Sequence, residues 1–173
     1  MNTILFNFFF SLSANPAIAW SSLFISNTLI YVFIVIAAIL PIIIRRDFFY
    51  SLLTMGTVAT SWVLVYIIKN IFMIPRPFIT LNLTPLFLES GFSFPSSHAT
   101  IISALSVVIW KINRKAGVIF FVFAVLVAIS RMVIGVHYPI DVIAGLCFGV
   151  IIGLCILWFY KVTNQFAFLK KYI

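Results

Sequence analysis

Long stretches of apolar residues dominate this chain and restrict what it can fold into. Five of them cover about residues 24–44, 48–70, 96–112, 116–136 and 140–160. A helix needs about 20 apolar residues to cross the hydrocarbon core of a bilayer. The chain is only 8% charged, whereas a soluble domain carries about 25%, so it could not cover its own surface in water. The sequence therefore predicts one all-α, membrane-embedded helical bundle over residues 1–173.

The N-terminal residues 1–20 leave the number of spans open at five or six. They carry no charge, but several polar residues and Pro16 interrupt them. We expect a short interfacial helix there, with a sixth span as the alternative. The stretch at 96–112 is short for a span, and we expect it to begin below the membrane surface.

The charged residues predict how the bundle is oriented. With five spans, one membrane face receives Arg45, Arg46, Lys111, Arg114, Lys115, Lys161, Lys170 and Lys171. The opposite face receives Lys69, Arg76 and Arg131, with both histidines, Glu89 and Asp141. Because Lys and Arg are enriched in cytoplasmic loops, the second face is expected to be extracytoplasmic. The net charge of +8 is dispersed between apolar spans, and this pattern argues against nucleic acid as a partner.

Three polar clusters lie on the predicted extracytoplasmic side. They are KNIFMIPRP at 69–77, FPSSHAT at 94–100 and SRMVIGVHYPID at 130–141. Ionisable residues at membrane depth are costly and are functional candidates by default. Each cluster alone also has a structural interpretation: a Lys or Arg anchor, a helix start at the histidine, or an Arg–Asp ion pair. All three together on one face favour a functional site.

Charge and spacing favour phosphate binding by these clusters. Lys69, Arg76 and Arg131 would converge with only one nearby carboxylate, and guanidinium groups suit phosphate oxygens. The helix that starts at Ser96 and Ser97 would add free backbone N–H groups, which bind anions. The sequence therefore predicts a phosphate pocket.

The two histidines suggest how a bound phosphate could react. Asp141 lies four residues after His137 and could accept a hydrogen bond from one imidazole nitrogen, so that the other ring nitrogen attacks phosphorus. His98 could protonate the departing oxygen, and such a pair predicts a bell-shaped pH profile. The carboxylates Asp47, Glu89 and Asp141 are dispersed, with Glu89 alone in its loop. We therefore expect no metal and no cofactor.

The three clusters together resemble the signature of the type 2 phosphatidic acid phosphatase superfamily. Its K-x6-R-P, P-S-G-H and S-R-x5-H-x3-D motifs correspond to residues 69–77, 95–98 and 130–141. The resemblance implies that His137 is a nucleophile that forms a phosphohistidine, with Asp141 as its orienting partner and His98 as the general acid.

The resemblance also implies a set of phosphate-binding residues. They are Lys69, Arg76, Ser96, Ser97 and Arg131. Ser97 replaces the usual glycine of the family. We expect serine to be tolerated there because a helix N-terminus does not require positive φ.

The apolar composition excludes the soluble members of this superfamily. The chain resembles the undecaprenyl pyrophosphate phosphatases of the bacterial cytoplasmic membrane, which remove the terminal phosphate of the polyprenyl carrier of cell-wall synthesis. Phosphatidylglycerophosphate, phosphatidic acid and lipid A phosphatases are alternatives. A phosphotransferase, or a non-catalytic lipid-binding or transport protein with the same pocket, would belong to another class. The expected partner is a lipid phosphate in the bilayer, and the oligomeric state stays open.

Overall fold

The computed structural model describes residues 2–170, with side chains for residues 2–163, and these residues form helices and connecting loops without a strand. The helices are α1 (Asn2–Ser11), α2 (Pro16–Phe24), α3 (Ile30–Arg45), α4 (Phe48–Phe72), α5 (Pro77–Thr80), α6 (Ser97–Ile112), α7 (Arg114–Val133) and α8 (Pro139–Lys170). A 3-10 turn (Leu12–Ala14) follows α1, and a π-helical turn (Ile25–Leu29) joins α2 to α3. The predicted all-α class is confirmed.

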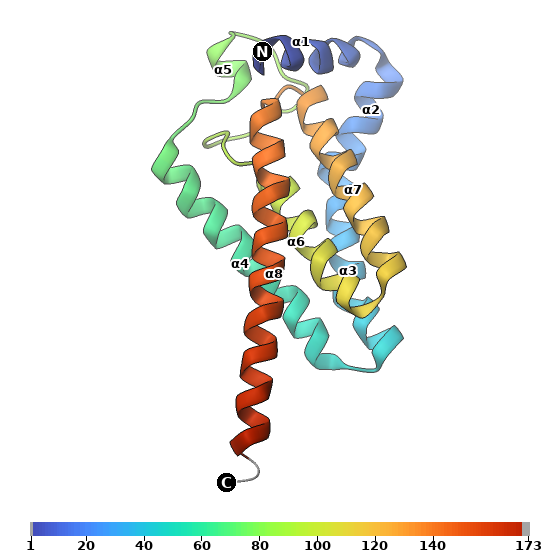
Figure 1. The fold of residues 1–173 in the computed structure, drawn as a ribbon. Coiled ribbons are helices and arrows are strands. Elements are labelled where there is room, and N and C mark those ends of the chain that lie inside the picture. Colours follow the sequence, from blue (N-terminus) through green and yellow to red (C-terminus); the bar gives the residue numbers. More distant parts are fainter. Residues whose placement is uncertain (1, 171–173) are drawn as a thin grey trace.

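Four helical segments are long and apolar enough to cross a membrane. They are Pro16–Arg45, Phe48–Thr80, Arg114–Val133 and Pro139–Thr163. The stretch predicted as a span at 96–112 is α6, which has only 16 residues. It contacts α3, α4, α7 and α8, and it lies at the centre of the bundle (Figure 1). Because neighbouring helices surround it, most of its side chains are buried in protein.

The N-terminal segment differs from its predicted boundary. Helix α1 lies across one end of the bundle (Figure 1) and is too short to span a membrane. The first long helix begins at Pro16, not at residue 24 as predicted. Asn15 caps this start, since its Oδ1 accepts a hydrogen bond from Ala17 N at 2.9 Å, and proline suits a first helical position. Residues 16–20 therefore belong to the first long helix, and the described residues before it, 2–15, supply no sixth span.

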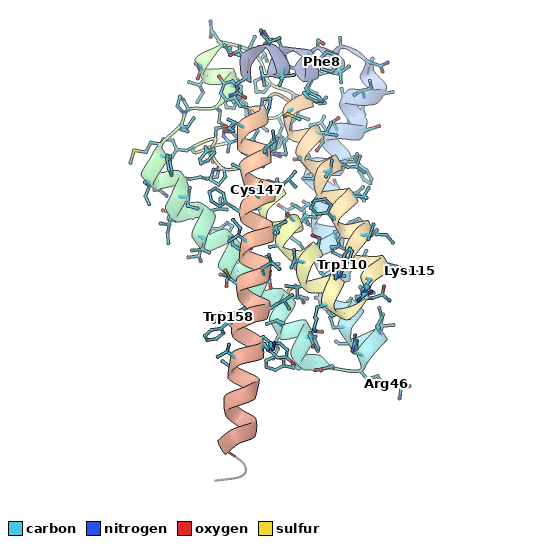
Figure 2. The ribbon with its side chains drawn as sticks, in the orientation of Figure 1. Phe8, Arg46, Trp110, Lys115, Cys147 and Trp158 are labelled. Atoms are coloured by element: carbon cyan, nitrogen blue, oxygen red, sulfur yellow. The ribbon has the colours of Figure 1, made fainter. Side chains whose placement is uncertain are left out.

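Basic side chains gather at the end of the bundle opposite α1. Figure 2 shows Arg46 and Lys115 toward that end, with Phe8 of α1 at the other. The Arg45 guanidinium donates to Ile112 O from Nη2 at 2.9 Å and from Nε at 3.3 Å. These bonds satisfy a carbonyl that the end of α6 leaves without a helical partner. The side chains at positions 170 and 171, predicted at this same end, lie outside the described residues.

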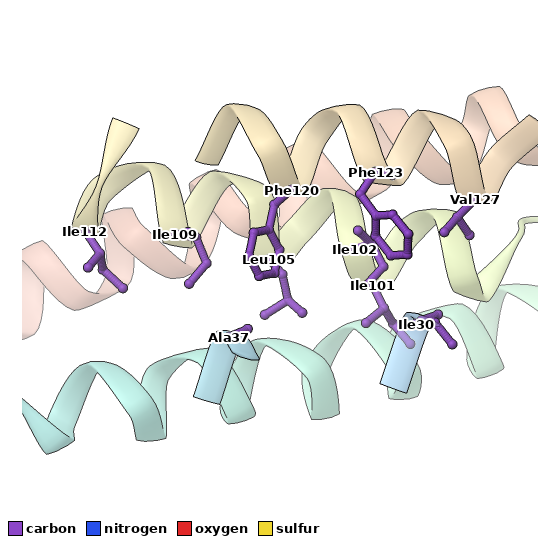
Figure 3. Close-up of a cluster of buried hydrophobic side chains, with 11 residues drawn as sticks. Ile30, Ala37, Ile101, Ile102, Leu105, Ile109, Ile112, Phe120, Phe123 and Val127 are labelled. Atoms are coloured by element: carbon purple, nitrogen blue, oxygen red, sulfur yellow. The ribbon is translucent and has the colours of Figure 1, made fainter. Parts of the chain in front are cut away.

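The hydrophobic core lies between α3, α6 and α7. Figure 3 shows Phe120, Phe123 and Val127 of α7 facing Ile102 and Leu105 of α6. Each of these five side chains is 5% exposed or less. This core holds α6 and α7 side by side, so that the N-terminus of one and the C-terminus of the other lie at the same end of the bundle.

Pro41 lies inside α3 and interrupts its hydrogen bonding. Proline has no N–H, so the carbonyl of Ala37, four residues earlier, loses its helical donor. The hydroxyl of Thr54 on α4 lies 3.1 Å from that oxygen and 2.8 Å from Ser51 O of its own helix, so its hydrogen is shared between the two carbonyls. A polar side chain from a neighbouring helix thus satisfies a backbone group that lipid could not satisfy.

Helices α6 and α8 approach each other along a row of glycines. Gly145, Gly149 and Gly153 recur at every fourth residue of α8, so they share one face. A Cβ at Gly149 would lie 2.4 Å from Thr100 O of α6. Small residues in this spacing let helix backbones pack closely in membranes. The glycine row therefore sets the distance between the N-termini of α6 and α8.

Candidate active site

Two loops meet at the α1 end of the bundle and form the candidate site. The loop at 81–96 leads into α6, and the loop at 134–138 joins α7 to α8. Leu86 N donates to Ile134 O at 3.0 Å, and this bond ties the two loops together. Gly135 has φ of +86°, and a Cβ there would lie 2.8 Å from the Phe10 ring of α1. Only glycine fits this left-handed turn under α1.

His137 is held in one tautomer by its neighbours. The side chain is 1% exposed, and its Nε2 lies 3.4 Å from Arg76 Nη1. A guanidinium only donates, so Nε2 must present its lone pair and Nδ1 must carry the hydrogen. Nδ1 lies 3.3 Å from Ser93 Oγ. The lone pair that could attack phosphorus is therefore on the Arg76 side of the ring.

Ser93 lies between the side chains of His137 and Asp141. The sequence did not indicate this role for Ser93. Its Oγ donates to Asp141 Oδ2 at 2.5 Å, and Tyr138 N donates to the same oxygen at 2.7 Å. His137 Nδ1 and Asp141 Oδ2 are 3.6 Å apart, close as expected but beyond a hydrogen bond. The prediction of a direct hydrogen bond is therefore wrong. The serine hydroxyl links the two side chains and orients the imidazole: it accepts a hydrogen bond from His137 Nδ1 and donates one to the Asp141 carboxylate.

The environment of His137 keeps its imidazole neutral. Burial lowers the pKa of His137 well below its ordinary value of 6.5, and the positive charges of Arg131 and Arg76 lower it further. Burial disfavours the charged form, and nearby cations do the same. The imidazole is therefore in the neutral form that a nucleophile requires at neutral pH.

Arg76 orders the backbone on both sides of the site. Its side chain is 2% exposed and donates to Gly91 O at 3.1 Å, to Ser90 O at 3.0 Å and to Val136 O at 3.1 Å. Since these carbonyls belong to the two different loops, one guanidinium holds both in place. Arg76 thus has a structural task in addition to the predicted phosphate contact.

Arg131 is buried beneath the site and is only partly used. Its Nη1 donates to Ser26 Oγ at 2.6 Å. Ser26 belongs to the π-helical turn between α2 and α3, a kind of turn often found at functional sites. Arg131 Nε makes no hydrogen bond to any described residue, whereas Nη2 contacts the Glu89 carboxylate. Nε remains for a ligand, and Ser26 is a second supporting residue that the sequence did not indicate.

Lys69 lies next to the loop that carries Ser93. Its Nζ donates to Phe92 O at 2.5 Å and to Ser93 O at 3.1 Å. An ammonium has three hydrogens, so one is left after these two bonds. Lys69 therefore fixes the loop and keeps one donor for an anion.

The sequence predicts that Glu89 stands alone in its loop, and the structure contradicts this prediction. Its Oε1 lies 3.1 Å from Arg76 Nη2, and its Oε2 contacts Arg131 Nη2. The expectation of only one carboxylate near the cations is therefore wrong as well. Among the described side chains, Arg131 pairs with Glu89 and makes no ion pair with Asp141. Sequence spacing could not show this, because the loop conformation decides where the carboxylate lies.

A cavity of about 320 Å³ opens beside Arg131. It is lined by Asn27, Tyr31, Phe87, Glu89, His98 and Arg131. Nδ1 of His98 has no hydrogen-bond partner among the described residues, so it is free to interact with a bound group. The part of the chain with described side chains brings no three His, Cys, Asp or Glu residues together as metal ligands.

The start of α6 contributes polar groups near the cavity. Ser96 is fully buried, and its N–H donates to Asp141 O at 3.0 Å. Its hydroxyl has no hydrogen-bond partner among the described residues, so this group can bind a ligand. Ser97 is the first residue of α6 and is not among the residues with positive φ. The replacement of the family glycine therefore costs no left-handed strain.

Comparison with known proteins places this arrangement in a family. Residues 47–165, more than half of the chain, match the PAP2 superfamily. The chain belongs to the PAP2 superfamily. Its predicted motifs at 69–77, 95–98 and 130–141 all lie within the matched region, and the family assignment made from them is confirmed.

Individual relatives agree with this assignment. The chain is 34% identical over 106 residues to "Undecaprenyl-diphosphatase BcrC" of Bacillus subtilis. The aligned region covers 61% of this chain and 55% of that protein. It thus spans about half the length of this curated relative. The Aquifex aeolicus LpxE structure superimposes with a TM-score of 0.71 at 24% identity, over 90% of this chain and 94% of that one.

A second solved structure shares the fold. It is the transmembrane PAP2 type phosphatidylglycerolphosphate phosphatase from Bacillus subtilis, with a TM-score of 0.64, 23% identity, and coverage of 92% of this chain and 94% of that one. The chain is therefore a multi-pass membrane protein with the fold of the transmembrane PAP2 phosphatases.

Proposed function

We propose that this PAP2 protein is a lipid phosphatase that removes the terminal phosphate of undecaprenyl pyrophosphate and leaves undecaprenyl phosphate. The observation that carries the catalytic part is the arrangement of His137. Its Nε2 lone pair faces Arg76, and its Nδ1–H faces Ser93 and Asp141. A neutral, oriented imidazole beside buried cations is what attack on a phosphate requires.

In the proposed first step, His137 Nε2 attacks phosphorus and the bond from phosphorus to the leaving oxygen breaks. Arg76, Arg131 and Lys69 stabilise the charge on the phosphoryl oxygens, and the hydroxyl of Ser96 and the backbone of Ser97 add donors. The developing imidazolium is stabilised through Nδ1 by the serine hydroxyl and, beyond it, the aspartate carboxylate. The product of this step is a phosphohistidine.

The proposed second step releases inorganic phosphate. His98 lines the cavity beside Arg131. Burial and the charges of Arg76 and Lys69 lower its pKa to about 4, so its protonated form is favoured only when the negative charge of a bound phosphate lies beside it. With phosphate bound, His98 would give its proton to the leaving oxygen in the first step. It then takes a proton from water, which attacks phosphorus and breaks the phosphorus–nitrogen bond. His137 returns to its neutral state and His98 to its protonated state.

The substrate part of the proposal is supported by the similarity to the Bacillus subtilis protein named "Undecaprenyl-diphosphatase BcrC". A polyprenyl chain would lie in the bilayer against the helices, with its pyrophosphate entering at the α1 end. The basic side chains at the opposite end favour a cytoplasmic position for that end. We therefore propose a site at the extracytoplasmic face of the bacterial cytoplasmic membrane, formed by a single domain.

The test is phosphate release from undecaprenyl pyrophosphate by the detergent-purified protein in EDTA, with His137→Ala as the control. Release by the wild type alone would support both the substrate and a metal-free histidine mechanism. Release only from phosphatidylglycerophosphate or phosphatidic acid would contradict the substrate and keep the mechanism. Transfer of phosphate to an added alcohol in place of water would indicate a phosphotransferase.

A further inference from the structure

Glu89 lies where the cations of the site would hold a phosphate. Of the residues that line the cavity, it is the only acidic one. Its Oε1 is 3.1 Å from Arg76 Nη2, and its Oε2 contacts Arg131 Nη2. A carboxylate that bridges two guanidinium groups makes the same charge-assisted contacts as two oxygens of a phosphate.

We infer that Glu89 occupies the phosphate position in the substrate-free enzyme and competes with the terminal phosphate of the substrate for Arg76 and Arg131. The inference rests on the proposed function, which assigns both arginines to phosphate binding. When a phosphate enters, the carboxylate leaves at least one guanidinium. The apparent affinity for phosphate is then lower than the bare cations would give, because only the fraction of molecules with Glu89 displaced can bind.

The surroundings indicate that Glu89 moves while the two arginines stay. Arg76 is tied to the backbone of two loops, and Arg131 to Ser26. Their side chains are 2% and 1% exposed, whereas that of Glu89 is 23% exposed and lies on the loop at 81–96. The carboxylate can therefore reach water when it is displaced.

Glu89 also compensates the charge of the two arginines and sets how strongly a ligand must bind them. Without Glu89, two buried guanidinium groups would face each other uncompensated whenever no substrate is bound, which is costly. With Glu89 in place, a ligand must bind the cations better than a carboxylate does. This sets a threshold that a terminal phosphate with two charges exceeds more easily than a singly charged phosphodiester headgroup of the surrounding bilayer. Glu89 is thus a specificity-determining residue of the phosphate pocket.

The test measures binding of inorganic phosphate to the detergent-purified full chain by isothermal titration calorimetry, which needs no turnover. Glu89→Gln keeps the shape and removes the charge, so we expect phosphate to bind at least about tenfold tighter than to the wild type. Asp47→Asn is the matched control. It makes the same change in net charge at the basic end, where Asp47 caps α4, and asparagine caps equally well. This control should stay within about twofold of the wild type.

Equal or weaker phosphate binding by Glu89→Gln would overturn the inference. Arg131→Gln separates this failure from failure of the proposed function. If Arg131→Gln binds phosphate as tightly as the wild type does, the proposed phosphate site is wrong. The same conclusion follows if none of the proteins binds phosphate. If Arg131→Gln loses binding but Glu89→Gln gains none, only the role of Glu89 is wrong.

Thermal unfolding distinguishes competition from a merely structural role and covers a variant that folds poorly. Glu89→Gln should unfold at a lower temperature without phosphate and gain more stability from added phosphate than the wild type, since at one ligand concentration the tighter-binding protein is stabilised more. Glu89→Asp keeps the charge but is too short to bridge both arginines, so it should show a smaller shift in the same direction. A lower unfolding temperature with no larger phosphate response in either variant would contradict the inference.

Discussion

Replacing Ser93 with alanine tests how His137 is oriented. The Ser93 hydroxyl lies 3.3 Å from His137 Nδ1 and 2.5 Å from Asp141 Oδ2, and the side chain is fully buried. Without it, the imidazole and the carboxylate are 3.6 Å apart and share no hydrogen bond. A hydrogen bond to a charged group contributes about 1.5–3 kcal/mol. Loss of that amount in the transition state lowers kcat about ten- to 150-fold.

The KM of Ser93→Ala should change little, because the removed hydroxyl contacts neither arginine that holds the phosphate. The assay is steady-state hydrolysis of a lipid phosphate by the purified variant, with Ser61→Ala as the control. Ser61 is equally buried, and its hydroxyl has no partner among the described residues, so its loss removes no hydrogen bond. The reasoning is refuted if kcat of Ser93→Ala stays within twofold of the wild type, or if Ser61→Ala loses as much.

Three further predictions concern pH, proton donation and helix packing. Burial, then Arg131 and Arg76, hold the pKa of His137 well below 6.5. The neutral imidazole attacks, so kcat/KM should hold as pH falls through 6.5 and be lost only below it; a pH profile with its acid limb at or above 6.5 would contradict this. His98→Gln should lower kcat by about 10²–10⁴-fold for phosphatidic acid, whose leaving alkoxide needs a proton, and far less for p-nitrophenyl phosphate; equal losses in the two kinetic assays would remove the histidine from proton donation. Gly149→Ala should destabilise the protein by about 1–3 kcal/mol, since its Cβ would overlap α6. Gly56→Ala, with nothing within 4 Å of its Cβ, should gain up to about 1 kcal/mol from helix propensity, and similar unfolding temperatures in detergent would argue against the close α6–α8 packing.

Much of the fold was predictable because hydropathy governs membrane helices. The apolar stretches correspond to α3, α4, α6, α7 and α8. The boundary at residue 24 was wrong because Ser21 and Ser22 weaken the apolar pattern there, whereas the Asn15 cap and Pro16 decide where the helix begins. Local capping chemistry therefore set a boundary that average hydropathy did not resolve.

The clusters that carry the candidate site were predictable for a topological reason. With five apolar segments alternating across the bilayer, the end of α4, the start of α6 and the α7–α8 loop must lie at one end, and the structure places them there (Figure 1). The supporting contacts were not predictable. Ser26 meets Arg131 across 105 residues of sequence, through a π-helical turn that no spacing indicates. Ser93 and Glu89 reach their partners because Arg76 and Lys69 donate hydrogen bonds to backbone carbonyls of the 81–96 loop and hold it in place.

The most direct test of the mechanism is a search for phosphate covalently bound to His137. Substrate labelled with ³²P in its terminal phosphate would be mixed with the purified protein, and the reaction would be stopped in base within one turnover. We predict a label on the wild-type chain that acid releases and base does not, as expected for a phosphohistidine, and none on His137→Ala. A wild type that turns over without labelling, or a label that persists on His137→Ala, would contradict the account.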